Sequence, residues 1–233
     1  MAVNEKVAKS YDPFFEPSVE KEYELPWNSA VFQANGFCES SVIIHLYQNW
    51  KTHVEPYEFV GFLHYDMKIS NNTLDHINEK LYVDHKDDKD ILFYFDKEPG
   101  SIQFGSSFVD LSTMKEECLC HQGWMKILDA YNKFFNTNHD YYIVSYEDLP
   151  LFHTFLIHKS LFAKIVPFVL DVMPSIVEYL TKTNMRHLPY TMETLWGMML
   201  MLHKRENQNM KFIKFTDFVH DDAIKDDWKP SIA

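Results

Sequence analysis

Apolar residues recur along the chain at two spacings, and these spacings separate the segments expected to be strands from those expected to be helices. Short apolar runs bounded by polar residues are typical of buried strands, whereas apolar residues at every third or fourth position indicate one buried face of a helix. The runs predict strands at 57–66, 91–95, 141–145 and 210–215, with a further apolar segment at 151–158. The helical spacing predicts helices at 39–51, 71–81, 124–135 and 192–202, the last preceded by Pro189-Tyr190-Thr191. This alternation is typical of an α/β fold with a central mixed, mostly parallel sheet flanked by helices.

Two prolines interrupt the apolar segment that follows residue 158. Pro167 and Pro174 each suit the first turn of a helix better than its interior, where proline removes a backbone hydrogen bond and clashes with the preceding turn. We therefore expect two or three short helices over 160–180.

Length and composition indicate one globular domain. The chain has 233 residues, and its hydrophobic content of 46% is sufficient for a core. Residues 1–27 differ from the rest, because acids cluster between Glu16 and Glu24 and little periodicity is visible. We expect an extended arm over 1–27 and a single domain over 28–233.

The net charge and the cysteine content limit which binding partners and which cellular compartment are expected. The formal net charge of -12 argues against a nucleic-acid partner, because such binding draws on clustered basic residues. Cys38, Cys118 and Cys120 fit neither a disulfide framework nor a zinc site, which favours a reducing compartment. The longest apolar region, 155–173, is broken by charged residues and a proline. We therefore expect no membrane span and a cytoplasmic protein.

The segment 57–70 carries the residues with the clearest chemistry. Its apolar half predicts a buried strand that leads into the polar residues His64, Tyr65, Asp66 and Lys68. N-cap residues and a helical spacing follow, so these side chains are expected in a crevice between strand and helix, where open α/β sheets bind ligands. Asp66 either holds a metal ion there or caps the helix that follows.

The same region resembles a known family of enzymes. Cys38-Glu39-Ser40, a helix ending Gln48-Asn49-Trp50-Lys51, and Val60-Gly-Phe-Leu-His64-Tyr65 are similar to the capsular-polysaccharide glycosyltransferases with an HYRRY motif. The variant His-Tyr-Asp-Met-Lys-x-Ser is closer to glycosyltransferase-like proteins of large algal DNA viruses, which resemble the GT-A fold. The likeness covers roughly residues 28–70, and beyond it only the order of elements agrees.

The resemblance implies a GT-A-like domain that uses a nucleotide-diphospho-sugar donor, with UDP as the expected nucleotide. The sugar would pass to a hydroxyl of a glycan acceptor, with inversion at the anomeric carbon. For a viral protein the expected location is the host cytoplasm.

One departure from the family motif indicates metal dependence. Where the motif has paired arginines after the tyrosine, this chain has Asp66 and Met67. Two arginines neutralise a diphosphate directly, whereas a carboxylate needs a divalent cation between itself and the phosphates. We therefore expect Mn2+ or Mg2+ as the cofactor, with Asp66 as a ligand. By the same resemblance His220, which follows the predicted last strand, would close the metal site.

Four further residues are expected to bind the substrate. His64 would hydrogen-bond a neighbouring strand or a phosphate, Tyr65 belongs to the same motif, and Lys68 would add a point charge for the diphosphate. Glu39 belongs to the family-like segment. Its alternative role is favourable placement against the dipole of the helix at 39–51.

The predicted general base is Glu193. It is expected in the first turn of an otherwise apolar helix, at the position where the related enzymes have an acid beside their acceptor site. A carboxylate there would take the proton from the acceptor hydroxyl as that hydroxyl attacks. Two alternatives remain: an acid that only favours the helix dipole, and Asp148 as the base, because its loop would face the same cleft.

The sequence therefore predicts a metal-assisted glycosyltransferase. A non-catalytic carbohydrate- or protein-binding domain on the same fold is the alternative from a different class. A nucleotidyltransferase would share the metal and phosphate chemistry but would release pyrophosphate.

Overall fold

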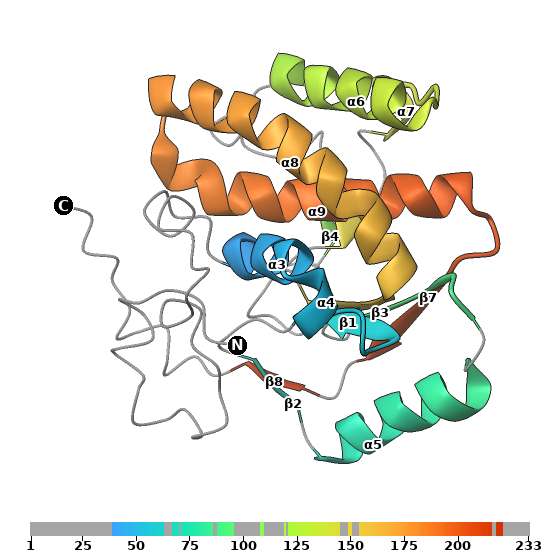
Figure 1. Cartoon of the computed structure of the whole chain (residues 1–233). Helices are drawn as coiled ribbons and strands as arrows, with labels where there is room; N and C mark the ends of the chain where they lie inside the picture. Colours follow the sequence, from blue (N-terminus) through green and yellow to red (C-terminus); the bar gives the residue numbers. More distant parts are fainter. Residues whose placement is uncertain are drawn as a thin grey trace, which may run out of the picture.

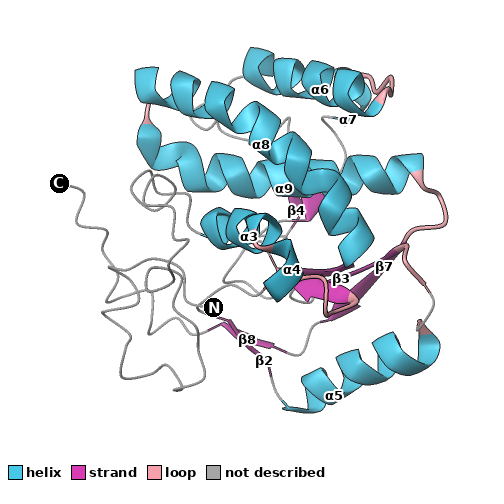
Figure 2. Ribbon diagram, in the orientation of Figure 1, coloured by secondary structure: helices cyan, strands magenta, loops and turns pink. Residues whose placement is uncertain are grey.

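The computed structural model of the chain is mixed α/β, as the sequence predicts (Figures 1 and 2). It describes residues 39–62, 67–69, 71–85, 88–95, 108–109, 119, 121–144, 149–150, 154–215 and 218–220. The helices are α3 (Glu39–Gln48), α4 (Trp50–His53), α5 (Asn71–Glu79), α6 (His121–Phe135), α7 (Tyr141–Val144), α8 (Lys159–Lys182) and α9 (Leu188–Glu206), with a π-helical turn η3 (Lys80–Asp84) and a 3-10 turn η4 (Met185–His187). The strands are β1 (Phe59–Gly61), β2 (Met67–Ile69), β3 (Ile91–Phe95), β4 (Phe108–Val109), β5 (Leu149–Pro150), β6 (Phe155–His158), β7 (Lys211–Phe215) and β8 (Phe218–His220). The predicted arm over 1–27 lies outside the described residues.

Four strands form the main sheet, in the order β1-β6-β3-β7. β6 pairs antiparallel with both β1 and β3, and β3 pairs parallel with β7. The expectation of a mostly parallel sheet is therefore wrong for the described strands, although a mixed sheet is confirmed. Parallel neighbours need a long crossover, and among these pairs β3 and β7 are joined by one, which contains α6, α8 and α9.

The sheet separates two hydrophobic clusters of unequal size. Leu92, Phe155 and Ile157 belong to the larger cluster, which also holds the buried faces of α6, α8 and α9. Ile91 and Phe93 belong to the smaller cluster, which is covered by α5 and η3. Neighbouring residues of β3 thus enter opposite clusters, as the period of two in a strand requires. Figure 1 shows the resulting layers, with α5 on one side of the sheet and α8 and α9 on the other.

A single helix, α8, occupies the segment where short helices were expected. It runs from Lys159 to Lys182 with Pro167 and Pro174 in its interior, so the prediction of two or three helices is wrong. Nine of its apolar side chains are buried. Burying each contributes about 1.5–3 kcal/mol, which together outweighs the roughly 3 kcal/mol that each interior proline costs.

The described residues include one helix with the length and composition of a membrane span, and it is α8. In this fold α8 packs against α3, α6 and α9 in the larger hydrophobic cluster. This is the environment of a core helix, and the absence of a membrane span stays a prediction.

The predicted strand at 141–145 is wrong, because residues 141–144 form the helical turn α7. The side-chain Oδ1 of Asp140 accepts a hydrogen bond from the backbone N–H of Tyr142 at 2.8 Å, as an N-cap residue does. Tyr141 and Val144 are buried while Tyr142 is 64% exposed. This helical burial pattern and the cap replace the expected strand.

The predicted strand at 57–66 is confirmed at 59–61, where β1 forms an edge of the main sheet. A second strand, β2, lies between Asp66 and α5, so the expected direct step from strand to helix is wrong. Because α5 begins at Asn71, the alternative in which Asp66 caps this helix is also wrong. The strand expected at 210–215 is confirmed as β7, but β8 follows it.

Candidate functional site

The predicted site residues fall into three groups by what the structure describes. Four lie outside the described residues, namely His64, Tyr65, Asp66 and Asp148. Three are described by their backbone alone, namely Glu39, Lys68 and His220. Glu193 is described in full.

The short ladder of β2 and β8 joins two segments far apart in the sequence, one following Asp66 and one containing His220, the two predicted metal ligands. Its antiparallel register pairs Met67 with His220, and Lys68 with Val219. Met67 is the chain neighbour of Asp66, the predicted metal ligand. The ladder therefore places His220 opposite the residue that follows Asp66, and opposite partners in such a ladder have Cα atoms about 4.5–5.5 Å apart.

A buried contact between α3 and α9 connects the other predicted residues. The indole Nε1–H of Trp196 donates a hydrogen bond to Ser40 Oγ at 3.1 Å, and both residues are almost fully buried. Ser40 follows Glu39 at the start of α3, and Trp196 lies one helical turn after Glu193 on α9. The same contact thus fixes both helix segments that carry these predicted acids.

Glu193 was predicted to lie in the first turn of its helix, and this prediction is wrong. α9 begins at Leu188, with Pro189 in its first turn, and no acidic residue lies in that turn. The field of a helix dipole on a side chain falls off within the first turn, so the interpretation of Glu193 as a dipole acid is weakened. Glu193 is instead half-buried, and its Oε1 is inaccessible to solvent. A carboxylate in such a place needs polar surroundings.

Buried polar side chains are concentrated on α3 and α9, the two helices joined by the contact between Ser40 and Trp196. The structure buries eight polar or charged residues among those it describes, and five of them lie on α3 or α9. These five are Ser40, Ser41, His45, Thr191 and Thr194. The α3 and α9 pair therefore combines hydroxyl and imidazole groups with a half-buried carboxylate.

The donor set of the predicted metal site suits a divalent cation. The predicted ligands Asp66 and His220 would supply a carboxylate and an imidazole, a pair that Mn2+ accepts, whereas Mg2+ prefers oxygen ligands. Among the side chains that the structure describes, no three His, Cys, Asp or Glu residues converge on one point.

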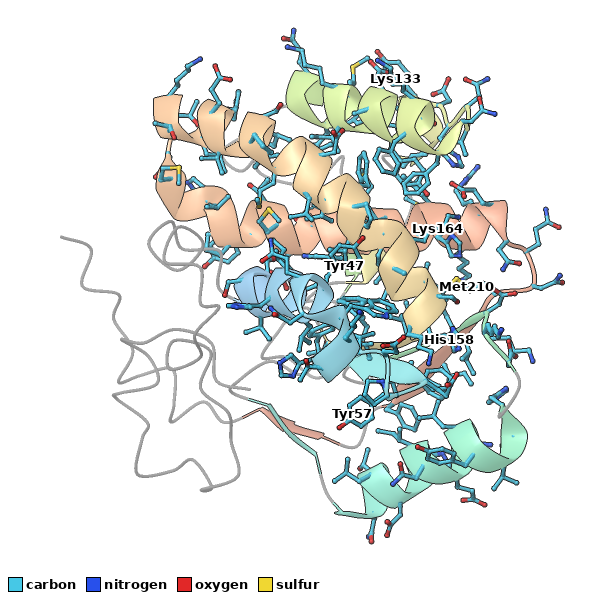
Figure 3. All side chains as sticks on the ribbon, in the orientation of Figure 1. Tyr47, Tyr57, Lys133, His158, Lys164 and Met210 are labelled. Carbon is cyan, nitrogen blue, oxygen red and sulfur yellow. The ribbon has the colours of Figure 1, made fainter. Side chains whose placement is uncertain are left out.

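A second polar network ties the helices together away from these residues. Tyr131 Oη donates a hydrogen bond to Glu206 Oε1 at 2.7 Å, His139 Nε2 lies 3.2 Å from the same oxygen, and Lys164 Nζ lies 3.5 Å from Oε2. Burial alone would raise the pKa of Glu206, but the hydrogen bonds from Tyr131 and His139 and the charge of Lys164 hold it below its ordinary value. Burial and the same carboxylate raise the pKa of Tyr131. The network joins α6, α8 and α9, and Figure 3 shows Lys164 projecting from α8 toward α9.

The start of α8 carries a third group of polar contacts. His158 Nδ1 accepts a hydrogen bond from the backbone N–H of Ser160 at 3.1 Å, so His158 serves as the N-cap of α8. Its Nε2 lies 3.3 Å from Glu58 Oε2, and Lys159 Nζ donates to Glu58 Oε1 at 3.0 Å. Figure 3 shows His158 where β6 meets α8. Sequence patterns missed this cap because His is not among the residues favoured at N-caps.

Comparison with protein-family models, with curated proteins and with solved structures gives no match for this chain. Its function is therefore inferred from its own residues and contacts.

Proposed function

We propose that this protein is a GT-A-like, metal-assisted glycosyltransferase. It transfers a sugar from a nucleotide-diphospho-sugar, with UDP as the expected nucleotide, to a hydroxyl of a glycan acceptor. The observation that supports the proposal best is the β2 and β8 ladder, because its register joins the segment after Asp66 to His220. Local sequence periodicity does not dictate this pairing.

On the donor side, Asp66 and His220 hold the divalent cation, Mn2+ or Mg2+. When bound, the cation neutralises the charge that develops on the departing nucleoside diphosphate. Lys68 adds a positive charge from β2. His64 and Tyr65 bind the donor from the segment that precedes β2. Glu39 lies at the start of α3, next to the buried contact of that helix with α9.

On the acceptor side, Glu193 takes the proton from the attacking hydroxyl. The oxygen of that hydroxyl forms a bond to the anomeric carbon while the bond from that carbon to the diphosphate oxygen breaks, so the configuration inverts. The half-buried position of Glu193 supports this role, because a carboxylate at the border of the core can meet an acceptor that binds at the surface.

Two measurements on the full chain test the proposal. Thermal shift with UDP and Mn2+ should show stabilisation that is lost with EDTA, and a ligand at 100 times its Kd adds about 2.7 kcal/mol. A screen of UDP- and GDP-sugars should then detect slow release of the nucleoside diphosphate without an acceptor. Binding without turnover for any donor would favour the non-catalytic domain instead. Release of pyrophosphate would favour a nucleotidyltransferase.

Three variants locate the donor site. Asp66→Ala and His220→Ala should each remove the Mn2+-dependent part of UDP binding, while the chain still melts cooperatively. Asp129→Ala is the matched control, because Asp129 is an exposed acid on α6, and Figure 1 shows this helix on the opposite side of the fold from the β2 and β8 ladder. Unchanged Mn2+-dependent UDP affinity in Asp66→Ala would remove this residue from the site.

A further inference from the structure

One aromatic side chain stands out on a helix that is otherwise mostly buried. Twelve residues of α9 are buried, whereas Tyr190, in its first turn, is 59% exposed. The backbone of Tyr190 is held in the helix, where its carbonyl oxygen accepts a hydrogen bond from Thr194 Oγ1 at 2.8 Å. The ring is thus a solvent-facing surface on a rigid support.

The spacing of Tyr190, Glu193 and Trp196 orders these side chains around α9. A helix turns about 100° per residue, so a step of three residues moves around the axis by about 60° in the reverse sense. Burial follows this order, because Tyr190 is exposed, Glu193 is half-buried and Trp196 is 1% exposed. Trp196 marks the contact with α3, through its hydrogen bond to Ser40. Glu193 therefore lies on the boundary between the exposed ring and the interface with α3.

From this order we propose that Tyr190 is the stacking platform for the acceptor sugar, and that the acceptor is a pyranose with an apolar face of C–H groups. The inference rests on the proposed function, because it takes Glu193 as the base for the same acceptor. A phenol ring offers a flat apolar face and loses little conformational freedom when it binds. Such a face orients a pyranose without contacting each hydroxyl.

The distance along the helix suits this arrangement. Side chains three residues apart have Cβ atoms about 5–6 Å from each other, which is close to the width of one sugar ring. A pyranose lying on the ring of Tyr190 can therefore present one edge hydroxyl to the carboxylate of Glu193. Tyr190 positions the acceptor, and Glu193 takes its proton.

The experiment compares three variants of the full chain. Tyr190→Ala removes the ring, Tyr190→Trp restores an aromatic face, and Tyr142→Ala is the matched control because Tyr142 is a similarly exposed tyrosine, at 64%, on α7. Initial rates are measured at saturating donor with p-nitrophenyl glycosides of glucose, galactose and mannose as acceptors. We expect the acceptor KM of Tyr190→Ala to rise about 3- to 10-fold, the range for loss of one aromatic contact. Tyr190→Trp should restore the acceptor KM, and Tyr142→Ala should leave it at the wild-type value.

A second measurement separates this inference from the proposed function. Saturation-transfer NMR with the methyl glycosides of the same sugars reports binding without any donor or turnover. A saturation-transfer signal that is lost in Tyr190→Ala and kept in Tyr142→Ala supports the platform even where no transfer is detected. Equal acceptor KM values for wild type and Tyr190→Ala, or no pyranose binding by the wild type in either assay, would overturn it.

Discussion

At the scale of single residues, the position of Glu193 in α9 favours the role of a general base over that of an acid placed against the helix dipole. An acid in the first turn of a helix is explained by the dipole, but Glu193 lies one turn further along, where that explanation weakens. Its neighbours along α9 are buried, so its carboxylate lies at the border of the core. A carboxylate in this position can meet an acceptor that binds at the surface, as a general base must.

We expect Glu193→Gln to separate binding from turnover. Glutamine keeps the size and hydrogen-bonding reach of the side chain but cannot take a proton. Transfer should fall by roughly 10²- to 10⁴-fold while the affinity for UDP and Mn2+ is unchanged. Initial rates at saturating donor, measured beside the melting temperature, check this.

The matched control is Glu79→Gln, because Glu79 is an exposed acid at the end of α5. Full activity in Glu193→Gln would reject Glu193 as the base and transfer that role to Asp148.

At the scale of elements, α8 shows how burial overrides local preference. Pro174 is exposed in the interior of a helix that the buried side chains of the other face hold in place. Its ring removes one backbone hydrogen bond from the helix without contributing to the core. The helix therefore contains a local defect that packing compensates.

Pro174→Ala should stabilise the protein. Alanine restores the missing N–H and the helix propensity, worth up to about 3 kcal/mol, and the loss of proline's rigidity in the unfolded chain offsets about 0.4–1 kcal/mol of this. Urea unfolding should show a higher midpoint with an unchanged slope. A lower midpoint would mean that the packing of α8 requires the bend at Pro174.

The network around Glu206 gives the helices a defined response to acid. Burial and the charge of Lys164 lower the pKa of His203, so the unfolded chain binds the proton more readily, and stability falls as the pH drops below about 6.5. The pKa of Glu206 is also lowered in the folded state. Its contribution to the stability of the fold is therefore present above about pH 4.5, and it is lost as the pH falls through the lower pKa of the folded state.

Glu206→Gln should therefore weaken the dependence of stability on pH below about 4.5. The control variant, Glu178→Gln, should show a dependence close to that of the wild type. Glu178 is an exposed acid paired with Lys182 on the surface of α8, where ion pairs contribute little. Urea unfolding at several pH values between 3 and 7 checks this. Parallel acid profiles for wild type and Glu206→Gln would show that the network does not couple to protonation.

At the scale of the whole molecule, the proposed donor site and the proposed acceptor site belong to different parts of the fold. The β2 and β8 ladder is separate from the four-stranded sheet, whereas Glu193 belongs to the larger hydrophobic core through α9. β8 pairs with β2 and does not join the main sheet among the described strands. Loss of β8 should therefore affect the function more than the stability.

Deleting residues 217–233 tests this division. The truncated chain should lose most of its affinity for UDP and Mn2+, because His220 is removed, but should keep a cooperative melting transition within a few degrees of the full chain. Thermal shift with and without ligand measures both effects. Normal donor binding by the truncated chain would exclude the C-terminal segment from the site.

Local patterns predicted the elements better than they predicted their arrangement. The apolar spacings located α3, α5, α6, α9, β3 and β7, because burial of one face determines those spacings. Asp140 was an available N-cap signal for α7, but the apolar run after it suggested a strand. The contact between Ser40 and Trp196 and the pairing of Met67 with His220 join segments far apart in the sequence, and no local pattern encodes them.

The strand order of the main sheet has a consequence for how the chain folds. The two outer strand pairs join residues far apart in the sequence: Val60 pairs with Ile157, about 100 residues away, and Leu92 pairs with Phe212, about 120 residues away. Contacts of such separation carry a large loop-closure entropy and slow folding. During synthesis, β3 must wait for almost the whole chain before its parallel partner exists. The edge of β3 that faces β7 therefore stays unpaired longest, and this interval is when the nascent protein is most prone to aggregate.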